Sequence, residues 1–216
     1  MTGSSPGCRR RCLPNPRRTR IQTENRLRIV AAAIDIFAQD GFRGATVDAI
    51  AERAGMSKPN LLYYFPSKEA IYREVLERLL DDWLAPLRAL DETGDPAAEI
   101  AAYLDRKIEM ARDFPAESRL FANEMLRGAP NLSDVLAGEL KALVDEKAEV
   151  IRAWIRQGRI RPIDPYHLIF AIWATTQHYA DFDPQVRAVL GDDGEGRFHD
   201  GAAFLRTLFL DGLRPR

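Results

Sequence analysis

The segment SKPNLLYYF, residues 57–65, carries side chains that can read the edges of DNA bases. In the major groove, a lysine can reach the acceptors of guanine and an asparagine can pair with adenine. Lys58 and Asn60 supply these groups, and Tyr63 and Tyr64 add two hydroxyls. The alternative is that the tyrosines fill the edge of a core and the polar groups are only solvated. The segment therefore predicts a base-reading helix, with a structural helix as the competing interpretation.

The residues around these side chains predict how such a helix is held. Leu61, Leu62 and Phe65 can face inward, and Gly55 permits a sharp turn before the helix. Two short helices joined by such a turn form a helix-turn-helix unit, whose second helix enters the major groove.

Groups that suit DNA phosphates lie at the edges of the same unit. Thr46 stands at a predicted helix start, where free backbone amides bind anions. The hydroxyl of Tyr64 and the ammonium of Lys68 also suit phosphate oxygens. We therefore expect contacts to the backbone on both sides of the base-reading helix.

Helical signals continue along the chain and predict an all-α fold of about nine helices. Apolar residues recur three or four positions apart, and glycines and prolines separate these stretches. No stretch alternates convincingly enough to predict a strand. The expected helices run from Glu24 to a stop at Gly41 and over about residues 46–54, 57–65, 67–88, 96–113, 115–127, 132–157, 164–181 and 198–213.

Charge is distributed unevenly along the 216 residues, although the net charge is only -1. Residues 1–68 contain 12 Lys and Arg against 5 Asp and Glu, whereas residues 69–216 contain 19 against 27. A basic end on an acidic body indicates that this end meets a polyanion. The alternative is that the arginines only solvate a flexible tail.

The first 21 residues have six arginines and three prolines but almost nothing to bury. This composition predicts a disordered basic arm, which either follows the minor groove of DNA or is a plain tail. Cys8 and Cys12 fall in this arm without a nearby His or further Cys. We expect free thiols rather than a disulfide or a zinc site.

Other classes of function find little support. His167, His178 and His199 lack further ligands at helical spacing, and no phosphate loop or nucleophile motif is present. We therefore expect no enzyme, no metal and no cofactor. No apolar run approaches the roughly 18–20 residues that cross a bilayer, and no secretory signal is seen, so we expect a cytoplasmic protein without a membrane partner. A helical protein-interaction module would leave the polar face of residues 58–63 unexplained.

Two tryptophans mark a candidate ligand site in the second part of the chain. Trp83 lies on the long helix that follows the base-reading helix, and Trp173 and Gln177 share a helix face. Indoles stack on flat rings, and a primary amide offers a donor and an acceptor side by side. These groups suit a small planar heterocycle with amide-like edges, and plain core packing is the alternative.

The last helices are candidates for a dimer interface. Their apolar residues exceed what a lone helix pair needs, so two helices from each subunit could build a four-helix interface. A core within one chain is the alternative. The residues concerned are Leu168, Ile169, Ile172, Trp173, Phe204, Leu205, Leu208 and Phe209.

Residues 28–74 resemble the N-terminal domain of TetR-family regulators. The motifs that carry the resemblance are FAQDGF at 37–42, TVDAI at 46–50, the Ala54-Gly55 turn, and YYF at 63–65 followed by SKE. The resemblance implies a homodimer that places two recognition helices in successive major grooves of a near-palindromic operator. Carried over position by position, it implies DNA contacts by Thr46, Ser57, Lys58, Pro59, Asn60, Tyr63, Tyr64 and Lys68.

The second part of the chain resembles one TetR subgroup, the regulators of pyrimidine utilisation. The stretches concerned are LDDWLAPLRAL, SRLFANEMLRGAP, LKALVDEKAEVIRAWI and RPIDPYHLIFAIWATTQHYADFDPQV. The similarity covers about residues 24–189 and the closing DGLRPR, whereas residues 190–199 and the arm match poorly. It implies a ligand site formed by Trp83, Trp173 and Gln177, with Phe121, Met125 and Tyr179 as weaker candidates.

The same resemblance implies a repressor of pyrimidine utilisation and nitrogen metabolism that uracil or thymine releases from its operator. A ligand between the helices of Trp83 and Trp173 would tilt the former and separate the recognition helices. A repressor that answers a purine, an amide or a xenobiotic is the alternative. We therefore divide the chain into a basic arm (1–21), a helix-turn-helix domain (22–68) and a ligand-binding and dimerisation domain (69–216).

Overall fold

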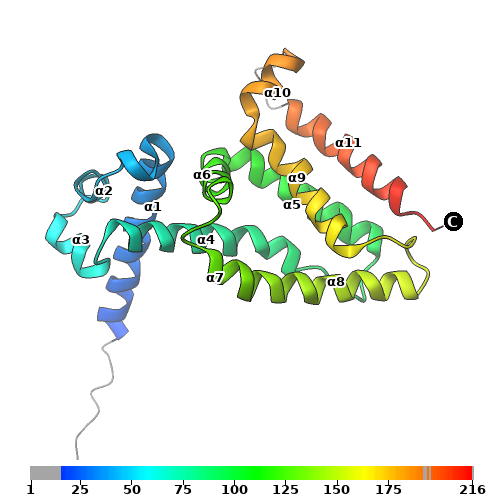
Figure 1. Ribbon diagram of the computed structural model, residues 1–216, viewed down its shortest axis with the longest axis horizontal. Coiled ribbons are helices and arrows are strands. Elements are labelled where there is room, and N and C mark those ends of the chain that lie inside the picture. The colour runs from blue at the N-terminus through cyan, green and yellow to red at the C-terminus, as the bar shows by residue number, and fades with distance from the viewer. Residues whose placement is uncertain (1–15, 192–193, 195, 216) are drawn as a thin grey trace, which may run out of the picture.

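The structure, a computed structural model, describes residues 16–191, 194 and 196–215. Every regular element in this part of the chain is a helix, which confirms the predicted all-α class. In Figure 1, α4 connects a small lobe, formed by α1 to α3, with a larger lobe formed by the later helices. The helices are α1 (Pro16–Gly44), α2 (Val47–Arg53), α3 (Lys58–Tyr64), α4 (Lys68–Arg88), α5 (Pro96–Asp113), α6 (Pro115–Leu126), α7 (Ser133–Val135), the π-helical turn η1 (Leu136–Leu140), α8 (Lys141–Arg156), α9 (Pro165–Asp181), α10 (Asp183–Leu190) and α11 (Gly196–Leu213).

Short polar caps define the helix-turn-helix unit as the sequence predicts. The hydroxyls of Thr46 and Ser57 accept hydrogen bonds from the amides of Ala49 and Asn60, which begin α2 and α3. Gly55 has a φ of 65°, a conformation that glycine adopts without strain. These local signals begin α2 and α3 and permit the turn between them.

Helix α4 belongs to two hydrophobic cores. Its residues through Leu79 pack with α1, α2 and α3, whereas its residues from Leu80 onward pack with α5, α8, α9 and α11. Ser67 caps its start by accepting from the amide of Ala70. The small lobe and the large lobe therefore share one continuous helix, which crosses the predicted boundary at residue 68.

Helix α1 begins at Pro16, eight residues before Glu24, where the sequence pattern predicted its start. Residues 16–21 were expected in the disordered arm, and the structure corrects this expectation. Proline is tolerated in the first turn of a helix, where its missing amide hydrogen has no partner to lose. Residues 1–15, with both cysteines and most of the predicted arm, lie outside the described part of the chain.

Two further differences concern the large lobe. Helix α10 falls where Pro184 and Gly191 were interpreted as breakers, because the proline sits in its first turn and the glycine ends it at a φ of 67°. The predicted helix at 132–157 contains the π-helical turn η1 before α8. Among the described residues, α10 is the one helix that the predicted set lacks.

Six of the eight predicted dimer candidates on α9 and α11 divide into two groups, and the other two, Trp173 and Phe209, are partly buried. Leu168, Ile169, Ile172 and Leu205 are buried within this chain, so they form its own core and not an interface. Phe204 and Leu208 are more than half exposed. One face of each helix is therefore used inside the lobe, and a second apolar face remains on its surface.

Helix α11 approaches α9 closely at Gly201. A Cβ at this position would lie 2.5 Å from Cζ of Tyr179, so a side chain here would displace the tyrosine ring. We expect Gly201→Ala to lower the free energy of unfolding by about 1–3 kcal/mol, as overpacking does in other cores. Gly212→Ala is the matched control in the same helix, because nothing lies within 4 Å of its Cβ. Chemical denaturation compares the two variants, and equal stabilities would contradict the close contact.

Candidate DNA-binding surface and ligand cavity

Helix α3 presents its polar residues outward. Lys58, Pro59 and Asn60 are exposed, and Tyr63 is 66% exposed, whereas Leu61 is fully buried. Leu62 was expected to face inward but is 37% exposed, since it lies one position past the buried residue on a short helix. The exposed face combines an ammonium, an amide and a phenol within two turns.

Two residues on the rim of this face already have partners. The ammonium of Lys58 lies 2.8 Å from Oδ2 of Asp48 on α2, so the two charges partly neutralise each other. Tyr64 is half-buried, and its hydroxyl accepts a hydrogen bond from Nδ2 of Asn25 at 2.8 Å. Helix α1 therefore orients the tyrosine that follows Tyr63.

Lys68 has a structural role that the sequence did not predict. Its Nζ donates to the carbonyl oxygens of Phe42 at 2.8 Å and Ala45 at 2.9 Å, and it lies 4.6 Å from the Phe42 ring centroid. These contacts attach the start of α4 to the turn between α1 and α2. The predicted phosphate contact has to share this ammonium with two backbone carbonyls.

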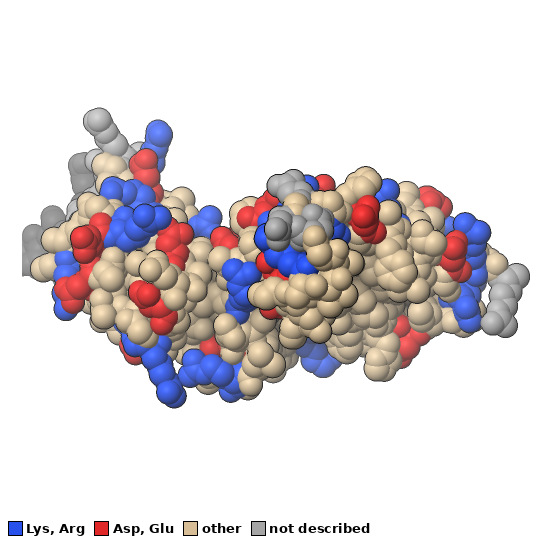
Figure 2. Space-filling view, turned by 90° about the horizontal axis from the view of Figure 1, so that it is seen from above, with Lys and Arg blue, Asp and Glu red and all other residues tan. Residues whose placement is uncertain are grey.

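Charges of both signs are interspersed over the surface. In the face shown in Figure 2, basic and acidic side chains alternate on both lobes. On this face, the basic excess counted along the sequence does not form one continuous patch. The local polar face of α3 therefore provides a clearer sign of DNA binding than the overall charge does.

A cavity of about 200 Å³ lies where α4, α5, α6, η1 and α9 meet. Five of the six predicted ligand residues line it together, although they come from three helices. They are Trp83, Phe121, Met125, Trp173 and Gln177, and the remaining lining residues are Leu80, Leu84, Lys107, Leu136 and Leu140. A mostly apolar wall with a few polar groups is typical of small-molecule sites.

The aromatic side chains in the cavity are held by neighbours. The rings of Trp83 and Phe121 have centroids 5.9 Å apart and are tilted by 43°. The indole Nε1 of Trp173 donates to the hydroxyl of Tyr103 at 2.6 Å, and burial raises the pKa of that tyrosine. The indole hydrogen of Trp173 is therefore already engaged, and its ring surface remains for packing.

Tyr179, the sixth predicted ligand residue, lies elsewhere. Its ring packs against Phe198, with centroids 6.2 Å apart, and covers Gly201 on α11. It is two positions past Gln177, and residues two apart on a helix do not share a face. Tyr179 thus contributes to the contact between α9 and α11.

Lys107 is a cavity residue that the sequence reasoning missed. It is 3% exposed, and its Nζ lies 4.8 Å from the ring centroid of Trp83. Burial lowers the pKa of this lysine to about 8, while the carboxylate of Asp181 acts in the opposite direction. The signal was present, because Lys107 follows Tyr103 and Leu104 at helical spacing on the buried face of α5.

Helix α6 connects the cavity with the small lobe. Glu124 lies on the same helix as Phe121 and Met125 and is fully buried. Its Oε1 accepts from the amide and the side chain of Asn131 at 2.8 and 3.0 Å, and its Oε2 accepts from the hydroxyl of Tyr72 at 3.3 Å. Since Tyr72 packs in the core of the small lobe, a displacement of α6 acts directly on that core.

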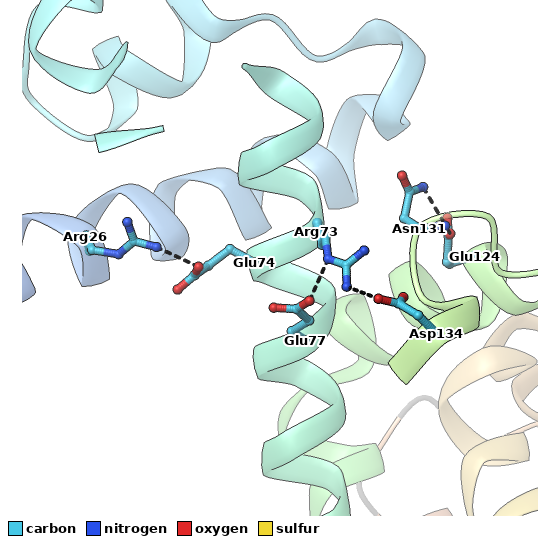
Figure 3. Close-up of polar contacts among 7 residues, drawn as sticks. All are labelled: Arg26, Arg73, Glu74, Glu77, Glu124, Asn131 and Asp134. Carbon is cyan, nitrogen blue, oxygen red and sulfur yellow. Dashed lines mark hydrogen bonds and ion pairs between the residues drawn. The ribbon is translucent and has the colours of Figure 1, made fainter. Parts of the chain in front are cut away.

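A second set of contacts crosses from α4 to α7. Arg73 pairs with Glu77 within α4 and with Asp134 at the start of α7, each at 2.7 Å (Figure 3). The next residue of α4, Glu74, pairs with Arg26 of α1, also at 2.7 Å. Neighbouring residues of α4 therefore contact the large lobe on one side and α1 on the other.

Known proteins share this combination of an N-terminal helix-turn-helix lobe and a C-terminal helical lobe. Residues 29–75 match the family described as bacterial regulatory proteins, tetR family, and residues 76–216 match the C-terminal region of YcdC-like proteins. The chain belongs to the TetR family of transcriptional regulators. It is 52% identical over 202 residues to the HTH-type transcriptional regulator RutR of Escherichia coli K12 and to that of Shigella flexneri, covering 93% of this chain and 95% of each relative.

A solved TetR-type structure supports the fold. A transcriptional regulator from Streptomyces coelicolor superposes with a TM-score of 0.72 and 28% identity, covering 89% of this chain and 99% of that one. None of the helices described here is long and apolar enough to cross a membrane. In the same part of the chain, no group of three or more His, Cys, Asp or Glu residues is arranged to hold a metal ion.

Lys107 makes the stability of the large lobe depend on pH. The folded chain releases this proton at about pH 8 and the unfolded chain at about 10.5, so between these values the unfolded state binds more protons. The free energy of unfolding therefore rises with pH in this window, by roughly 3 kcal/mol at most. We expect Lys107→Met to be more stable than the wild type at pH 7, and this difference to shrink between pH 8 and 10.5. Denaturation of both proteins across this range measures it, and parallel profiles would contradict a buried charged lysine.

Proposed function

We propose that this TetR-family chain is a cytoplasmic repressor of pyrimidine utilisation and nitrogen metabolism that uracil or thymine releases from its operator. The observation that carries the proposal is the cavity, because Trp83, Trp173 and Gln177 meet there beside Phe121 and Met125. These residues were assigned to pyrimidine binding through the resemblance to one TetR subgroup. Their meeting in one cavity of suitable size supports that assignment.

The volume of the cavity limits the effector. Drug-sized ligands occupy pockets of about 300–1,000 Å³, so about 200 Å³ suits a molecule with a single ring. Indole surfaces can pack against such a ring, and the amide of Gln177 can match an edge that carries a carbonyl beside an N–H. Among the alternative effectors, a compact amide fits this volume, whereas a bicyclic purine or a larger xenobiotic requires the cavity to widen.

DNA recognition in this proposal depends on α3 and the helix starts around it. Asn60 and Lys58 contact base edges in the major groove, and Tyr63 is the exposed phenol beside them. Backbone contacts come from the starts of α2, α3 and α4 and from the remaining predicted residues, Thr46, Ser57, Pro59, Tyr64 and Lys68. Binding requires Lys58 to exchange Asp48 for DNA.

The operator is near-palindromic because the regulator acts as a homodimer. The exposed apolar residues of α9 and α11 support an interface there, and the exposed fractions of Phe170, Phe204 and Leu208 are 49%, 62% and 51%. Two such helices from each subunit would form a four-helix contact. Two α3 helices must then lie about 34–36 Å apart to enter successive major grooves.

Effector binding changes this spacing through the helices that line the cavity. A ligand against Trp83 acts on α4, and a ligand against Phe121 and Met125 acts on α6, which contacts Tyr72 through Glu124. The effector must favour the conformation that releases DNA, by about 1–3 kcal/mol of coupling or more. Equal affinity for both conformations would not relieve repression.

Tryptophan fluorescence tests the effector, because two of the three tryptophans line the cavity. We expect uracil and thymine to quench it saturably and to release operator DNA at the same concentrations, whereas cytosine and xanthine do not. Gln177→Leu should weaken the response at least 10-fold through the loss of its hydrogen bonds, while DNA binding without effector serves as the folding control. Release by xanthine but not by uracil would assign the regulator to a purine instead.

Asn60→Ala tests the DNA surface. This residue is exposed, so its loss should leave the fold intact and weaken operator binding by roughly 5- to 150-fold. The operator is first selected from random DNA with the wild-type protein, and affinities are then measured at one fixed salt concentration. Gln157→Ala, which removes an exposed amide from the large lobe, is the matched control. Equal affinities of all three proteins would contradict the assignment of α3.

A further inference from the structure

Lys107 differs from the other buried charged residues of the described chain in having no partner. Lys147 donates to the carbonyl of Leu90, Arg197 pairs with Asp183, and Glu124 accepts from Asn131 and Tyr72. Within the described residues, Lys107 makes no hydrogen bond or ion pair, and its recorded contact is with the face of Trp83. The side chain of Lys107 is 3% exposed, and an ammonium largely removed from bulk water without a hydrogen-bond partner is costly. A ligand that offers an acceptor to this ammonium would lower that cost.

Lys107 lies in the wall of the cavity between α4, α5, α6, η1 and α9. Four leucines and the aromatic rings of Trp83, Phe121 and Trp173 form most of the wall, and Gln177 is the lining side chain that offers an oxygen acceptor as well as a donor. The carboxylate of Asp181 attracts Lys107 from α9, but Asp181 accepts from the hydroxyl of Ser118. The ammonium therefore faces an apolar space with its donors unused by the protein.

We propose that Lys107 selects the effector by donating a charge-assisted hydrogen bond from Nζ to a ring oxygen. The inference rests on the proposed function, and it defines the ligand class as heterocycles with a carbonyl at the edge that meets α5. The ammonium of Lys107 is a strong hydrogen-bond donor, and a ring oxygen is an acceptor that can satisfy it. A ligand that fills the cavity without offering such an acceptor leaves the ammonium desolvated and unpaired, so it binds with lower affinity.

A flat ring without a carbonyl is not enough for tight binding in this cavity. A planar apolar molecule of the same size can pack against the indole rings, but it offers Lys107 no hydrogen-bond acceptor. A ring carbonyl against the same ammonium forms a hydrogen bond to a charged group, which is stronger than a neutral one. Lys107 thus excludes apolar rings and favours cyclic imides and lactams, while Gln177 contacts a different edge of the ring.

Replacing one ring oxygen of the ligand by sulfur tests which oxygen accepts the hydrogen bond from Lys107. Uracil, 2-thiouracil and 4-thiouracil have nearly the same shape, and sulfur is the weaker acceptor at the substituted position. Their dissociation constants are measured with the wild type, with Lys107→Met and with Lys147→Met. We expect one of the two thio analogues to bind the wild type at least about 10-fold more weakly than uracil, and Lys107→Met to remove this difference.

The controls separate the possible failures. Lys147→Met removes a buried lysine outside the cavity, so the discrimination between uracil and the thio analogue should survive in it. Uracil binding with unchanged discrimination in Lys107→Met would overturn the role of Lys107 and leave the proposed function standing. Failure of the wild type to bind uracil or either thio analogue would overturn both. The affinity for toluene, which has no carbonyl, should change in the opposite direction. Lys107→Met should bind toluene more tightly than the wild type does, because no ammonium is left unpaired.

Discussion

Helix α4 has to bury one continuous apolar stripe in two separate cores. Its residues through Leu79 complete the core of the small lobe, and those from Leu80 onward belong to the core of the large lobe. Because a helix is stiff and both ends are packed, a displacement at one end is transmitted to the other. The position of α3 and the shape of the cavity therefore both depend on α4, and the proposed coupling between ligand binding and DNA binding relies on this helix.

Helix α6 adds a second connection between the same two regions. Phe121 contacts both cores, and Glu124 joins the segment after α6 to Tyr72 inside the small lobe. Leaving a buried carboxylate without its hydrogen bonds costs free energy. We therefore expect Asn131 and Tyr72, which donate to Glu124, to move together with it. The ion pairs of Arg73 with Glu77 and Asp134 are more exposed and contribute less. In the proposed mechanism, the apolar cores and the buried polar cluster would therefore contribute more to the coupling than the surface ion pairs do.

Lys107 lowers the stability of the large lobe at neutral pH, because burial disfavours its charge and lowers its pKa to about 8. The role that we propose for Lys107 in selecting the effector would account for a charged residue at this position of α5. Functional sites commonly break the rule that buried charged groups are paired. A core in which every polar group already has a partner offers no free hydrogen-bonding group to a ligand.

The sequence by itself determined most of the helices, their caps and the exposed polar face of α3, because these depend on short-range chemistry. Thr46, Ser57 and Gly55 act on neighbours within a few residues, and the polar face of α3 follows from helical periodicity. Five of the residues that line the cavity were also proposed from the sequence. Trp83, Trp173 and Gln177 came from their helix positions and from the resemblance, and Phe121 and Met125 came from the resemblance alone. Only the tertiary structure decided that Trp83, Trp173 and Gln177 share a cavity, that Tyr179 packs on α11, and that Lys107 faces the ligand space. These outcomes depend on how helices far apart in the chain pack together, and helical periodicity says which face is buried but not what that face meets.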